Sequence, residues 1–215
     1  MKHEVSKDLR EEYSGTPLDL ADVAASPFHQ FARWFDEAVA AQVKLANGMT
    51  LATVGPDGRP SARVVLLKSY DEHGFVFYTS YQSRKAQELT VHPWASLLFW
   101  WAPLERQIRV EGCAARVSAA VSDEYFATRP RASNLSAMAS PQSQTVSSRR
   151  WLEDRVAQLE REWQGRPLVR PDDWGGYRLE PERFEFWQGR PDRLHDRVCY
   201  QKVPDGQWRI ERLAP

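Results

Sequence analysis

Apolar and polar positions alternate in short runs along much of this chain, a pattern that indicates β-strands more than long helices. The first strand-like runs are MTLATV (49–54), SARVVLLKSY (61–70) and FVFYTS (75–80). The turn signals GPDGRP and DEHG separate them, so the three runs predict an antiparallel meander. Later strand-like runs occupy 94–102, 106–118, 175–181, 183–189, 196–203 and 207–215. In total about eight short strands are predicted, at a spacing typical of a barrel or sandwich.

One long helix is predicted to begin at Ser26-Pro27, a capping residue followed by proline, and to end near Gly48. Its apolar residues recur at helical spacing, at Phe28, Phe31, Phe35, Val39 and Val43. Residues 1–25 precede it and predict an irregular arm.

Shorter helices are predicted at 83–92, which Ser83 would cap, at 122–130 and at 147–163. Residues 129–146 are polar and predict a loop. Because strands and helices do not alternate along the chain, a doubly wound parallel sheet is not expected. We therefore expect a mainly β protein of the α+β kind with peripheral helices.

Composition and charge narrow the class of protein. The 215 residues suit one large domain, and the formal net charge of +0 gives no global field that would attract nucleic acid or anionic lipid. The longest apolar-rich run, WASLLFWWAPL, has 11 residues and is too short to span a bilayer. The N-terminus has no apolar signal core, and Cys113 and Cys199 form no metal-spaced or redox pair. A soluble cytoplasmic protein is expected.

Common catalytic motifs are missing from the sequence. It contains no GxSxG, HExxH, GxGxxG or GxxxxGK[ST] pattern. Its five histidines have no ligand spacing; they are His3, His29, His73, His92 and His195. A metal site and a hydrolase triad are therefore not expected.

Cations cluster at two places that suit phosphate. Arg63 and Lys68 lie at the two ends of RVVLLK, on opposite faces of a predicted strand. Arg84 and Lys85 lie in the first turn of a predicted helix, where the helix dipole favours an anion. Solvated side chains would also explain both pairs, and codon bias would explain the excess of 23 Arg over 6 Lys.

Two further stretches carry hydroxyl, guanidinium and aromatic groups. Tyr125 and Arg129 are four residues apart, with Ser133 after them, and Gln142 and Ser143 add a second polar cluster. These side chains suit a phosphate monoester, although an arginine-bearing loop is often only a loop.

Near the C-terminus, Trp187 precedes GRPDRLHDR, in which Arg193, His195 and Arg197 alternate. Aromatic and arginine side chains together can sandwich a planar ring, and His195 can donate, accept or carry a proton near neutral pH. Residues alone thus suggest a phosphorylated planar cofactor acting on a second phosphorylated ligand.

The same stretches, taken in order, resemble the pyridoxine (pyridoxamine) 5'-phosphate oxidase family. The similarity runs from about residue 8 to the end through LREEY, RVVLLK, VFYT, SRKAQEL, LERQIRVEG, YFATRPRAS, QS, WGGYRL, EFWQGRPDRLHDR and RLAP. It implies an FMN-binding split β-barrel with antiparallel Greek-key strands, made of an arm at 1–25 and a single domain at 26–215. It also implies a cytoplasmic homodimer with FMN at the subunit interface.

The activity implied by the resemblance belongs to vitamin B6 biosynthesis and salvage. A flavoprotein oxidase would convert pyridoxamine 5'-phosphate and pyridoxine 5'-phosphate to pyridoxal 5'-phosphate, with O2 reduced to H2O2. FMN would supply the redox chemistry while the protein orients and polarises the substrate.

The resemblance also assigns roles to individual residues. FMN would be bound by Arg63, Val64, Val65, Leu66, Leu67, Lys68, Tyr78, Thr79, Arg84, Lys85, Gln107, Gln142, Ser143, Trp187 and Arg197. The substrate phosphate would be held by Lys68, Tyr125, Arg129 and Ser133. Arg193 and His195 would cover the pyridine ring as the catalytic pair, and Arg10 and Tyr13 resemble a lid. Met138 stands where some members of the family carry an aromatic residue, which affects local loop packing.

Two alternatives stay open. A relative with the same FMN barrel could act on another substrate, such as a phenazine precursor, although it would not need the substrate-phosphate residues. A non-catalytic FMN or pyridoxal phosphate carrier would not need Arg193 and His195. A nucleic-acid binder would normally show a basic patch, which the zero net charge disfavours.

Overall fold

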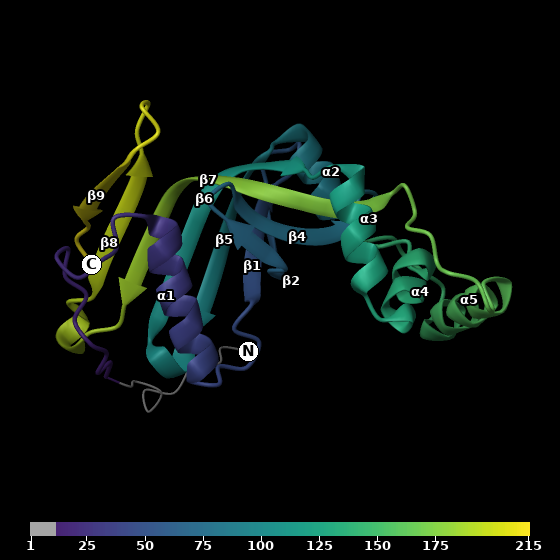
Figure 1. Cartoon of the computed structure of the whole chain (residues 1–215), viewed down its shortest axis with the longest axis horizontal. Coiled ribbons are helices and arrows are strands. Elements are labelled where there is room, and N and C mark those ends of the chain that lie inside the picture. Colours follow the sequence, from purple (N-terminus) through teal and green to yellow (C-terminus); the bar gives the residue numbers. More distant parts are fainter. Residues whose placement is uncertain (1–11) are drawn as a thin grey trace, which may run out of the picture. The chain divides into compact units, whose positions relative to one another are not determined.

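The strands form one hydrogen-bonded array in the computed structural model, which describes residues 12–215 (Figure 1). Their order is β2-β1-β5-β6-β7-β4-β3, and β8 pairs with both β7 and β9. The strands are β1 (Gly48–Val54), β2 (Pro60–Leu66), β3 (Ser69–Asp71), β4 (Gly74–Ser80), β5 (Trp94–Trp101), β6 (Arg106–Arg116), β7 (Trp174–Gln188), β8 (Asp196–Lys202) and β9 (Trp208–Arg212).

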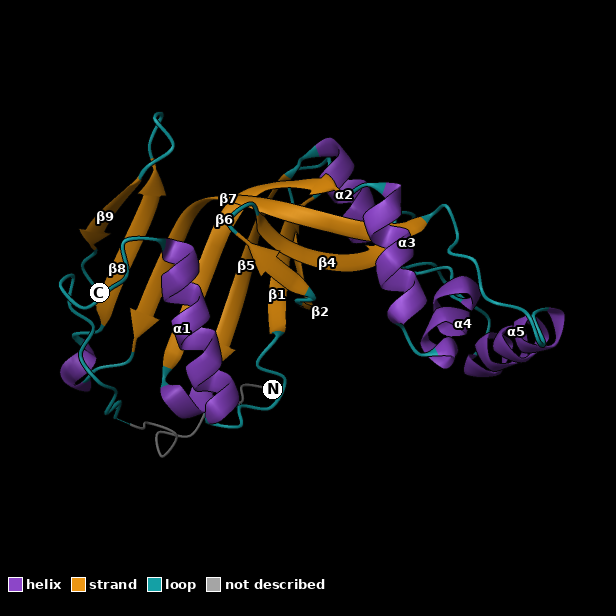
Figure 2. Cartoon of the chain, in the orientation of Figure 1, coloured by secondary structure: helices purple, strands orange, loops and turns teal. Residues whose placement is uncertain are grey.

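The α-helices, purple in Figure 2, lie before β1, between β4 and β5, and between β6 and β7 in the chain. They are α1 (Pro27–Ala40), α2 (Arg84–Val91), α3 (Ala119–Thr128), α4 (Arg131–Ala139) and α5 (Arg149–Glu162). Short 3-10 turns follow β5 at η2 (Ala102–Leu104) and β7 at η3 (Pro191–Arg193). None of the helices in residues 12–215 has the length and hydropathy of a transmembrane span.

The chain divides into two compact units. The first unit comprises residues 12–49, 97–111 and 182–215, and the second comprises 50–96 and 112–181. Each has its own aromatic or aliphatic packing, described below, and each carries a different part of the predicted site.

In the first unit, α1 supplies the core. Its residues Phe31 and Trp34 are buried. The ring of Phe31 packs 5.2 Å from that of Phe99, and the ring of Trp34 packs 5.4 Å from that of Phe186. Aromatic pairs at these centroid distances stabilise the fold beyond the area that they bury.

The end predicted near Gly48 is wrong, because α1 ends at Ala40 and Gln42 has a left-handed φ of 55° that no α-helix continues through. Phe31 belongs to the apolar positions predicted at helical spacing, but Val39 is exposed and Val43 lies beyond the end of the helix.

In the second unit, alternating strand residues are buried. Leu51, Phe75 and Phe77 are 0% exposed, and the ring of Phe77 stacks on that of Tyr177. Antiparallel pairing of β4 with β7 sets Phe77 opposite Tyr177, so the register places these rings together.

The loop predicted over 129–146 is wrong in part, because α4 occupies Arg131–Ala139. Leu135 and Ala139, four residues apart, are buried against Leu159 of α5. Few apolar residues mark this helix, so tertiary packing against α5 stabilises what local hydrophobic periodicity does not reveal.

The predicted strand 61–70 is also wrong in its length. It divides into β2 and β3, and between them Leu67 is buried while the Lys68 backbone N–H donates to Val76 O (2.9 Å). The predicted meander is therefore two pairs, β2 with β1 and β3 with β4, at opposite ends of the strand order. An apolar run does not show where a strand changes its partner.

Conversely, the two strands predicted at 175–181 and 183–189 are one strand, β7. Its first part pairs with β4 and its last part with β8, and Pro181 falls between the two paired segments. Proline has no N–H to donate, and Pro181 lies outside the residues that pair with β4 and β8.

Ser26 and Ser83 occupy the N-cap positions of α1 and α2, as predicted, but neither side chain caps its helix. The Ser83 hydroxyl instead donates to Ser80 O at 2.7 Å. The cap position was predictable from residue type, whereas the competing local hydrogen bond was not.

Candidate active site

Most of the predicted FMN and substrate residues of the second unit line one cavity. Its volume is about 470 Å³. The lining residues are Arg63, Val64, Val65, Leu66, Lys68, Tyr78, Thr79, Lys85, Tyr125, Arg129, Pro130, Ser133 and Gln142. The structure thus brings together residues from β2, β4, α2, α3 and α4 that are up to 79 positions apart in the chain.

A second cavity of about 570 Å³ shares Tyr78, Thr79, Arg129, Ser133 and Gln142 with the first. It extends along α4 and β4 and is lined in addition by Ser80, Ala132, Ser136, Ala137, Ser140 and Trp174. The shared residues make the two cavities neighbours, with the Arg129 side chain bordering both.

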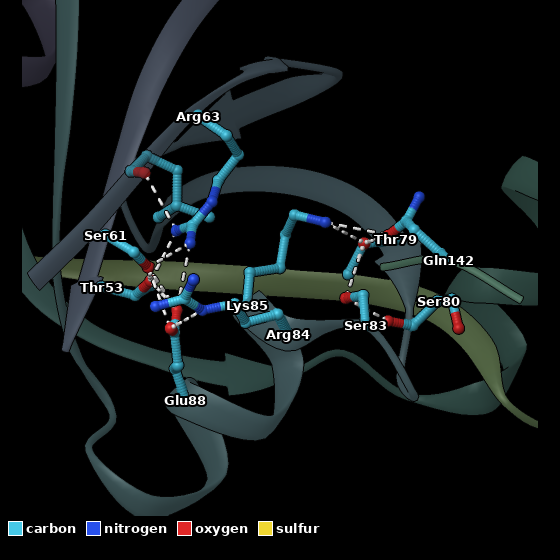
Figure 3. Close-up of polar contacts among 11 residues, drawn as sticks. Thr53, Ser61, Arg63, Thr79, Ser80, Ser83, Arg84, Lys85, Glu88 and Gln142 are labelled. Carbon is cyan, nitrogen blue, oxygen red and sulfur yellow. Dashed lines mark hydrogen bonds and ion pairs between the residues drawn. The ribbon is translucent and has the colours of Figure 1, made fainter. Parts of the chain in front are cut away.

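Arg63 is held in place by a buried acid. Its guanidinium donates to Leu51 O (3.1 Å), Thr53 Oγ1 (2.5 Å), Ser61 Oγ (2.5 Å) and Glu88 Oε2 (3.0 Å). Figure 3 shows these contacts converging from β1, β2 and α2. The half-buried position of Arg63 on β2 follows from strand alternation, because Ser61, Arg63 and Val65 share the less exposed face.

Lys85 is the most buried cation of the cavity. It is 9% exposed, and its Nζ donates to Gln142 Oε1 (2.9 Å) and Thr79 Oγ1 (3.2 Å). Burial and, to a smaller extent, the nearby Arg63 lower the pKa of Lys85, Glu88 acts in the opposite direction, and the resulting pKa is about 8. An amine in this environment is stabilised as a cation when an anion approaches it.

Three cations that line the cavity have no carboxylate partner among the described residues. Lys85 contacts neutral oxygens only, and the Arg129 guanidinium donates to Asn134 Oδ1 (2.9 Å) and Ser133 O (3.1 Å). No hydrogen bond or ion pair of the Lys68 ammonium occurs within residues 12–215. The cavity therefore carries positive charge that the described part of the chain does not neutralise.

An aromatic stack borders the same cations. The rings of Tyr78 and Tyr125 lie 3.9 Å apart at 19°, and Trp174 continues the stack at 5.5 Å from Tyr78. The Arg129 guanidinium lies 4.6 Å from the Trp174 ring, a cation–π contact. Burial and the nearby Tyr125 raise the pKa of Tyr78, so its hydroxyl remains a neutral donor and acceptor.

Three predicted residues of the second unit lie outside the two cavities. Leu67 is 5% exposed and belongs to the core. Arg84 is exposed and pairs with Glu88 (Nε to Oε1, 2.8 Å), while Ser143 is exposed with a left-handed φ of 72°. The Arg84 pair also explains in part why two cations are tolerated in the first turn of α2.

The first unit holds the other predicted residues. Its central feature is a cluster of rings in which Trp187 lies 4.7 Å from His195 and 5.4 Å from Tyr13. Tyr13 lies 5.3 Å from His195, with the two rings nearly perpendicular. Tyr13 and His195, 182 residues apart in sequence, are therefore direct neighbours in this unit.

The surroundings of His195 favour the neutral form of its imidazole ring. Burial lowers its pKa, and the charge of the nearby Arg193 lowers it further. The Arg190 backbone N–H donates to His195 Nδ1 (3.1 Å), so the ring proton of the neutral form lies on Nε2. Arg193 itself is exposed and has a left-handed φ of 60°.

Arg197 is engaged with a buried acid. Its Nε and Nη2 both lie 2.9 Å from Glu185 Oε1, and its Nη1 donates to Ala214 O (2.7 Å). Gln107, on β6, is half-buried. Arg10 lies outside the described residues.

Sequence reasoning missed the acids that organise these cations. Glu88 and Glu185 are both buried and both accept from predicted FMN residues. The spacing of Arg84 and Glu88, four residues apart on a helix, was an available signal for Glu88. Trp174 was visible in WGGYRL, but nothing in its spacing indicated a stack with Tyr78.

Two family models match the chain. Residues 35–162 match the model described as pyridoxamine 5'-phosphate oxidase. Residues 174–215 match the model described as the pyridoxine 5'-phosphate oxidase C-terminal dimerisation region. Together the two matches include the residues that line both cavities and the ring cluster except Tyr13.

Curated relatives match over nearly the full length. A pyridoxine/pyridoxamine 5'-phosphate oxidase from Bordetella pertussis is 57% identical over 213 residues, covering 97% of this chain and 98% of the relative. One of the same name from Gloeothece citriformis is 53% identical over 208 residues, covering 97% of both chains.

Solved structures share the fold. PhzG from Burkholderia lata, in complex with tetrahydrophenazine-1-carboxylic acid, has a TM-score of 0.88 at 34% identity, covering 94% of this chain and 100% of that one. A pyridoxamine 5'-phosphate oxidase-related, FMN binding protein from Nostoc punctiforme has a TM-score of 0.71 at 17% identity, covering 90% and 100%. The mainly β fold class predicted from the sequence, that of the FMN-binding split barrels, is confirmed. The chain belongs to the pyridoxamine 5'-phosphate oxidase family.

Proposed function

We propose that this chain is an FMN-dependent oxidase that converts pyridoxamine 5'-phosphate and pyridoxine 5'-phosphate to pyridoxal 5'-phosphate, with O2 reduced to H2O2. Relatives that carry the oxidase name cover nearly the whole chain at 53% and 57% identity, so the chain is an oxidoreductase of this family. FMN is the cofactor of the family.

One observation of the structure carries the proposal. Lys68, Lys85 and Arg129 line one cavity and have no carboxylate partner among residues 12–215. Hydroxyl groups of Tyr125 and Ser133 line it as well. Cations and hydroxyls together are the donor set that binds phosphate groups, and both the cofactor and the substrate of the proposed reaction carry one.

The residues present fit FMN. Lys85 is a buried amine whose partners are neutral oxygens, so an anion beside it would stabilise its charge. Besides Lys85, the second unit would hold FMN through Arg63, Val64, Val65, Leu66, Leu67, Lys68, Tyr78, Thr79, Arg84, Gln142 and Ser143. Gln107, Trp187 and Arg197 of the first unit would also contact it. When bound, FMN supplies the two-electron redox chemistry of the oxidation.

The substrate would be held by its phosphate and its ring. Lys68, Tyr125, Arg129 and Ser133 are proposed to bind the phosphate. Arg193 and His195 are proposed to act on the pyridine ring, with Arg193 positioning it and the neutral His195 as an assisting proton carrier. Tyr13, and Arg10 outside the described residues, are proposed to cover the substrate.

Assembly and location complete the proposal. The C-terminal match to a dimerisation region supports a homodimer, and we place FMN at its subunit interface. No disulfide joins Cys113 to Cys199, which is consistent with a reducing cytoplasm. The arm at 1–25 and a single domain at 26–215 remain our division of the chain.

The phenazine alternative is less well supported. PhzG is 34% identical to this chain, whereas the curated oxidases reach 57%. The residues proposed to grip the substrate phosphate are all present here, and a substrate without phosphate would not need them. The carrier alternative leaves the neutral His195 and its ring cluster without a role.

The test is an aerobic assay of the full-length, FMN-loaded protein with pyridoxamine 5'-phosphate, and with dephosphorylated pyridoxamine as control. We expect aldehyde product and peroxide in equal amounts from the phosphorylated substrate alone. Turnover of both substrates at equal rates would contradict the proposed binding of the substrate phosphate. A flavin-loaded protein that turns over neither would contradict the oxidase and favour the relative with another substrate or the carrier.

A further inference from the structure

Glu88 is a buried carboxylate with no free acceptor capacity. It is 2% exposed on α2, and its oxygens accept from Thr53 Oγ1 (2.5 Å), Ser61 Oγ (2.8 Å), Arg63 Nη2 (3.0 Å) and Arg84 Nε (2.8 Å). Burial alone would raise the pKa of Glu88, but these hydrogen bonds outweigh it and lower the pKa to about 2. The group is therefore a permanent anion near neutral pH and is unsuited to proton transfer.

The two arginines bonded to Glu88 differ in how many of their N–H donors are already used. Arg63 uses both of its Nη groups within the network, on Leu51 O, Thr53, Ser61 and Glu88. Arg84 is bound through Nε, and its exposed side chain makes no other hydrogen bond or ion pair within residues 12–215. Glu88 thus fixes the direction of Arg84 and leaves its Nη donors available.

Arg84 begins α2, where backbone N–H groups of the first turn lack partners within the helix. Figure 3 shows Arg63 and Arg84 converging on Glu88, while Lys85 extends the other way, toward Thr79 and Gln142. The start of α2 therefore presents one cation oriented by an acid and one cation bound to neutral oxygens only.

The charges of this network match a phosphate monoester. Arg63, Arg84 and Lys85 contribute three positive charges, and Glu88 neutralises one of them. Two positive charges remain, and a phosphate monoester carries about −1.5 to −2 near neutral pH.

We propose that Glu88 is a positioning residue for the cofactor phosphate, which it serves by holding Arg63 in the network and by aiming the Nη groups of Arg84. This inference rests on the proposed FMN-dependent function. It adds to that function a residue that touches neither flavin nor substrate and acts through arginine.

The decisive variant is Glu88→Gln, which keeps the size of the side chain and removes its charge. Arg84 bonds to one carboxylate oxygen and Arg63 to the other. Whichever way the new amide turns, its NH2 group faces an arginine donor, so one arginine must move. If charge alone mattered, the variant would bind phosphate more tightly; if position matters, it binds phosphate less tightly.

The readout is the ratio of the dissociation constants for riboflavin and FMN, measured by flavin fluorescence on the full-length protein after removal of bound flavin. Riboflavin lacks the phosphate, so damage to the fold alone would weaken both ligands alike. We expect Glu88→Gln to lower the preference for FMN about tenfold or more.

Glu153→Gln is the matched control. Glu153 pairs with Arg149 Nε (2.7 Å) at the same four-residue helical spacing, but both side chains are exposed on α5. We expect this variant to keep the wild-type preference. If Glu88→Gln is insoluble, Arg84→Lys replaces it, because the side chain at this position is exposed. Lysine has one ammonium group, so it cannot both pair with Glu88 and leave further donors free for phosphate.

The outcomes separate the two proposals. A folded Glu88→Gln, or Arg84→Lys in its place, that keeps or increases the wild-type preference for FMN overturns the inference alone. A wild-type chain that binds neither flavin overturns the proposed function and this inference with it. A lost preference in the variant, with wild-type preference in Glu153→Gln, supports both.

Discussion

At the scale of single residues, the chemistry of the cavity depends on groups whose charge is set by their neighbours. Lys85 is buried beside the neutral oxygens of Thr79 and Gln142 and titrates near pH 8, whereas Glu88 is ionised by the donors around it. Burial thus weakens the charge of Lys85 but not that of Glu88, because only Glu88 has charged hydrogen-bond partners.

The lowered pKa of Lys85 makes cofactor binding depend on pH. As pH rises through about 8, Nζ loses its proton and its attraction for phosphate, so FMN affinity should fall between about pH 7 and pH 9. Bound phosphate favours the protonated amine and raises its pKa, so the fall begins near the pKa of the flavin-free protein and ends near the higher pKa of the complex. Fluorescence titration with FMN across this range measures it.

Lys85→Arg is the control for this pH dependence, because arginine stays charged throughout the range. Its FMN affinity should be nearly independent of pH over the same interval. Parallel pH profiles for the wild type and this variant would assign the titration to another group.

The sequence predicted the cations of the site better than their partners. Arg63, Lys68, Lys85 and Arg129 were all named from residue type and local spacing, and all four line one cavity. Their partners come from other elements, so no local pattern could reveal them. Glu88, for example, meets Arg63 only because α2 packs beside β1 and β2.

At the scale of elements, the described part of the N-terminal arm is fastened to the turn before β6 and to the end of β7. Glu105 Oε2 accepts from the backbone N–H groups of Ser14 (2.7 Å) and Gly15 (2.8 Å). Tyr13 then packs on Trp187 and His195. The arm is therefore an ordered element of the first unit from residue 12 onward, although it contains neither helix nor strand up to α1.

Gly189 makes this packing possible. A Cβ atom at this position would lie 2.7 Å from Tyr13 Cδ1 and 3.0 Å from Glu105 Cβ, so Gly189→Ala must displace the tyrosine. If Tyr13 covers the substrate, KM for pyridoxamine 5'-phosphate should rise about three- to tenfold, the value of one aromatic contact, with FMN affinity unchanged. Steady-state kinetics of the FMN-loaded variant measure this.

Tyr13→Ala should raise KM by a similar factor, and the double variant should show little further change, since both substitutions remove one contact. Additive effects would mean that Gly189 acts independently of Tyr13.

Element types were predictable where a periodic pattern was strong, as in α1 with its buried Phe31, although the pattern did not single out the buried Trp34. The pattern failed where long-range packing decides the outcome. Helix α4 depends on Leu159 of α5, and the division of 61–70 into β2 and β3 depends on different strand partners. Neither cause is local in sequence, so neither was available to pattern reasoning.

At the scale of the whole molecule, the C-terminal region is the part that the family associates with assembly. The dimerisation model spans 174–215, which contains β7, β8 and β9 as well as Trp187, His195 and Arg197. The sequence thus assigns proposed ring-binding residues and dimerisation to one segment.

A dimer should be stable without flavin if this region alone directs assembly. Sedimentation of the full-length protein should give about 50 kDa, twice the chain mass of 24.8 kDa, both with and without FMN. A species at the single-chain mass that retains FMN would contradict both the dimer and a cofactor site at its interface.

The saturated carboxylate of Glu88 also constrains how this chain can change over generations. Its donors come from three elements and belong to Thr53, Ser61, Arg63 and Arg84. With Glu88 itself, five positions therefore depend on one buried charge. Loss of the acid leaves the positive charges of the two arginines uncompensated, and loss of an arginine leaves a buried carboxylate with too few hydrogen-bond donors. A single substitution at one of these positions should therefore lower the stability of the fold, whereas two compensating substitutions need not. Substitutions at these five positions should therefore be coupled, although Thr53 and Glu88 are 35 positions apart in the chain.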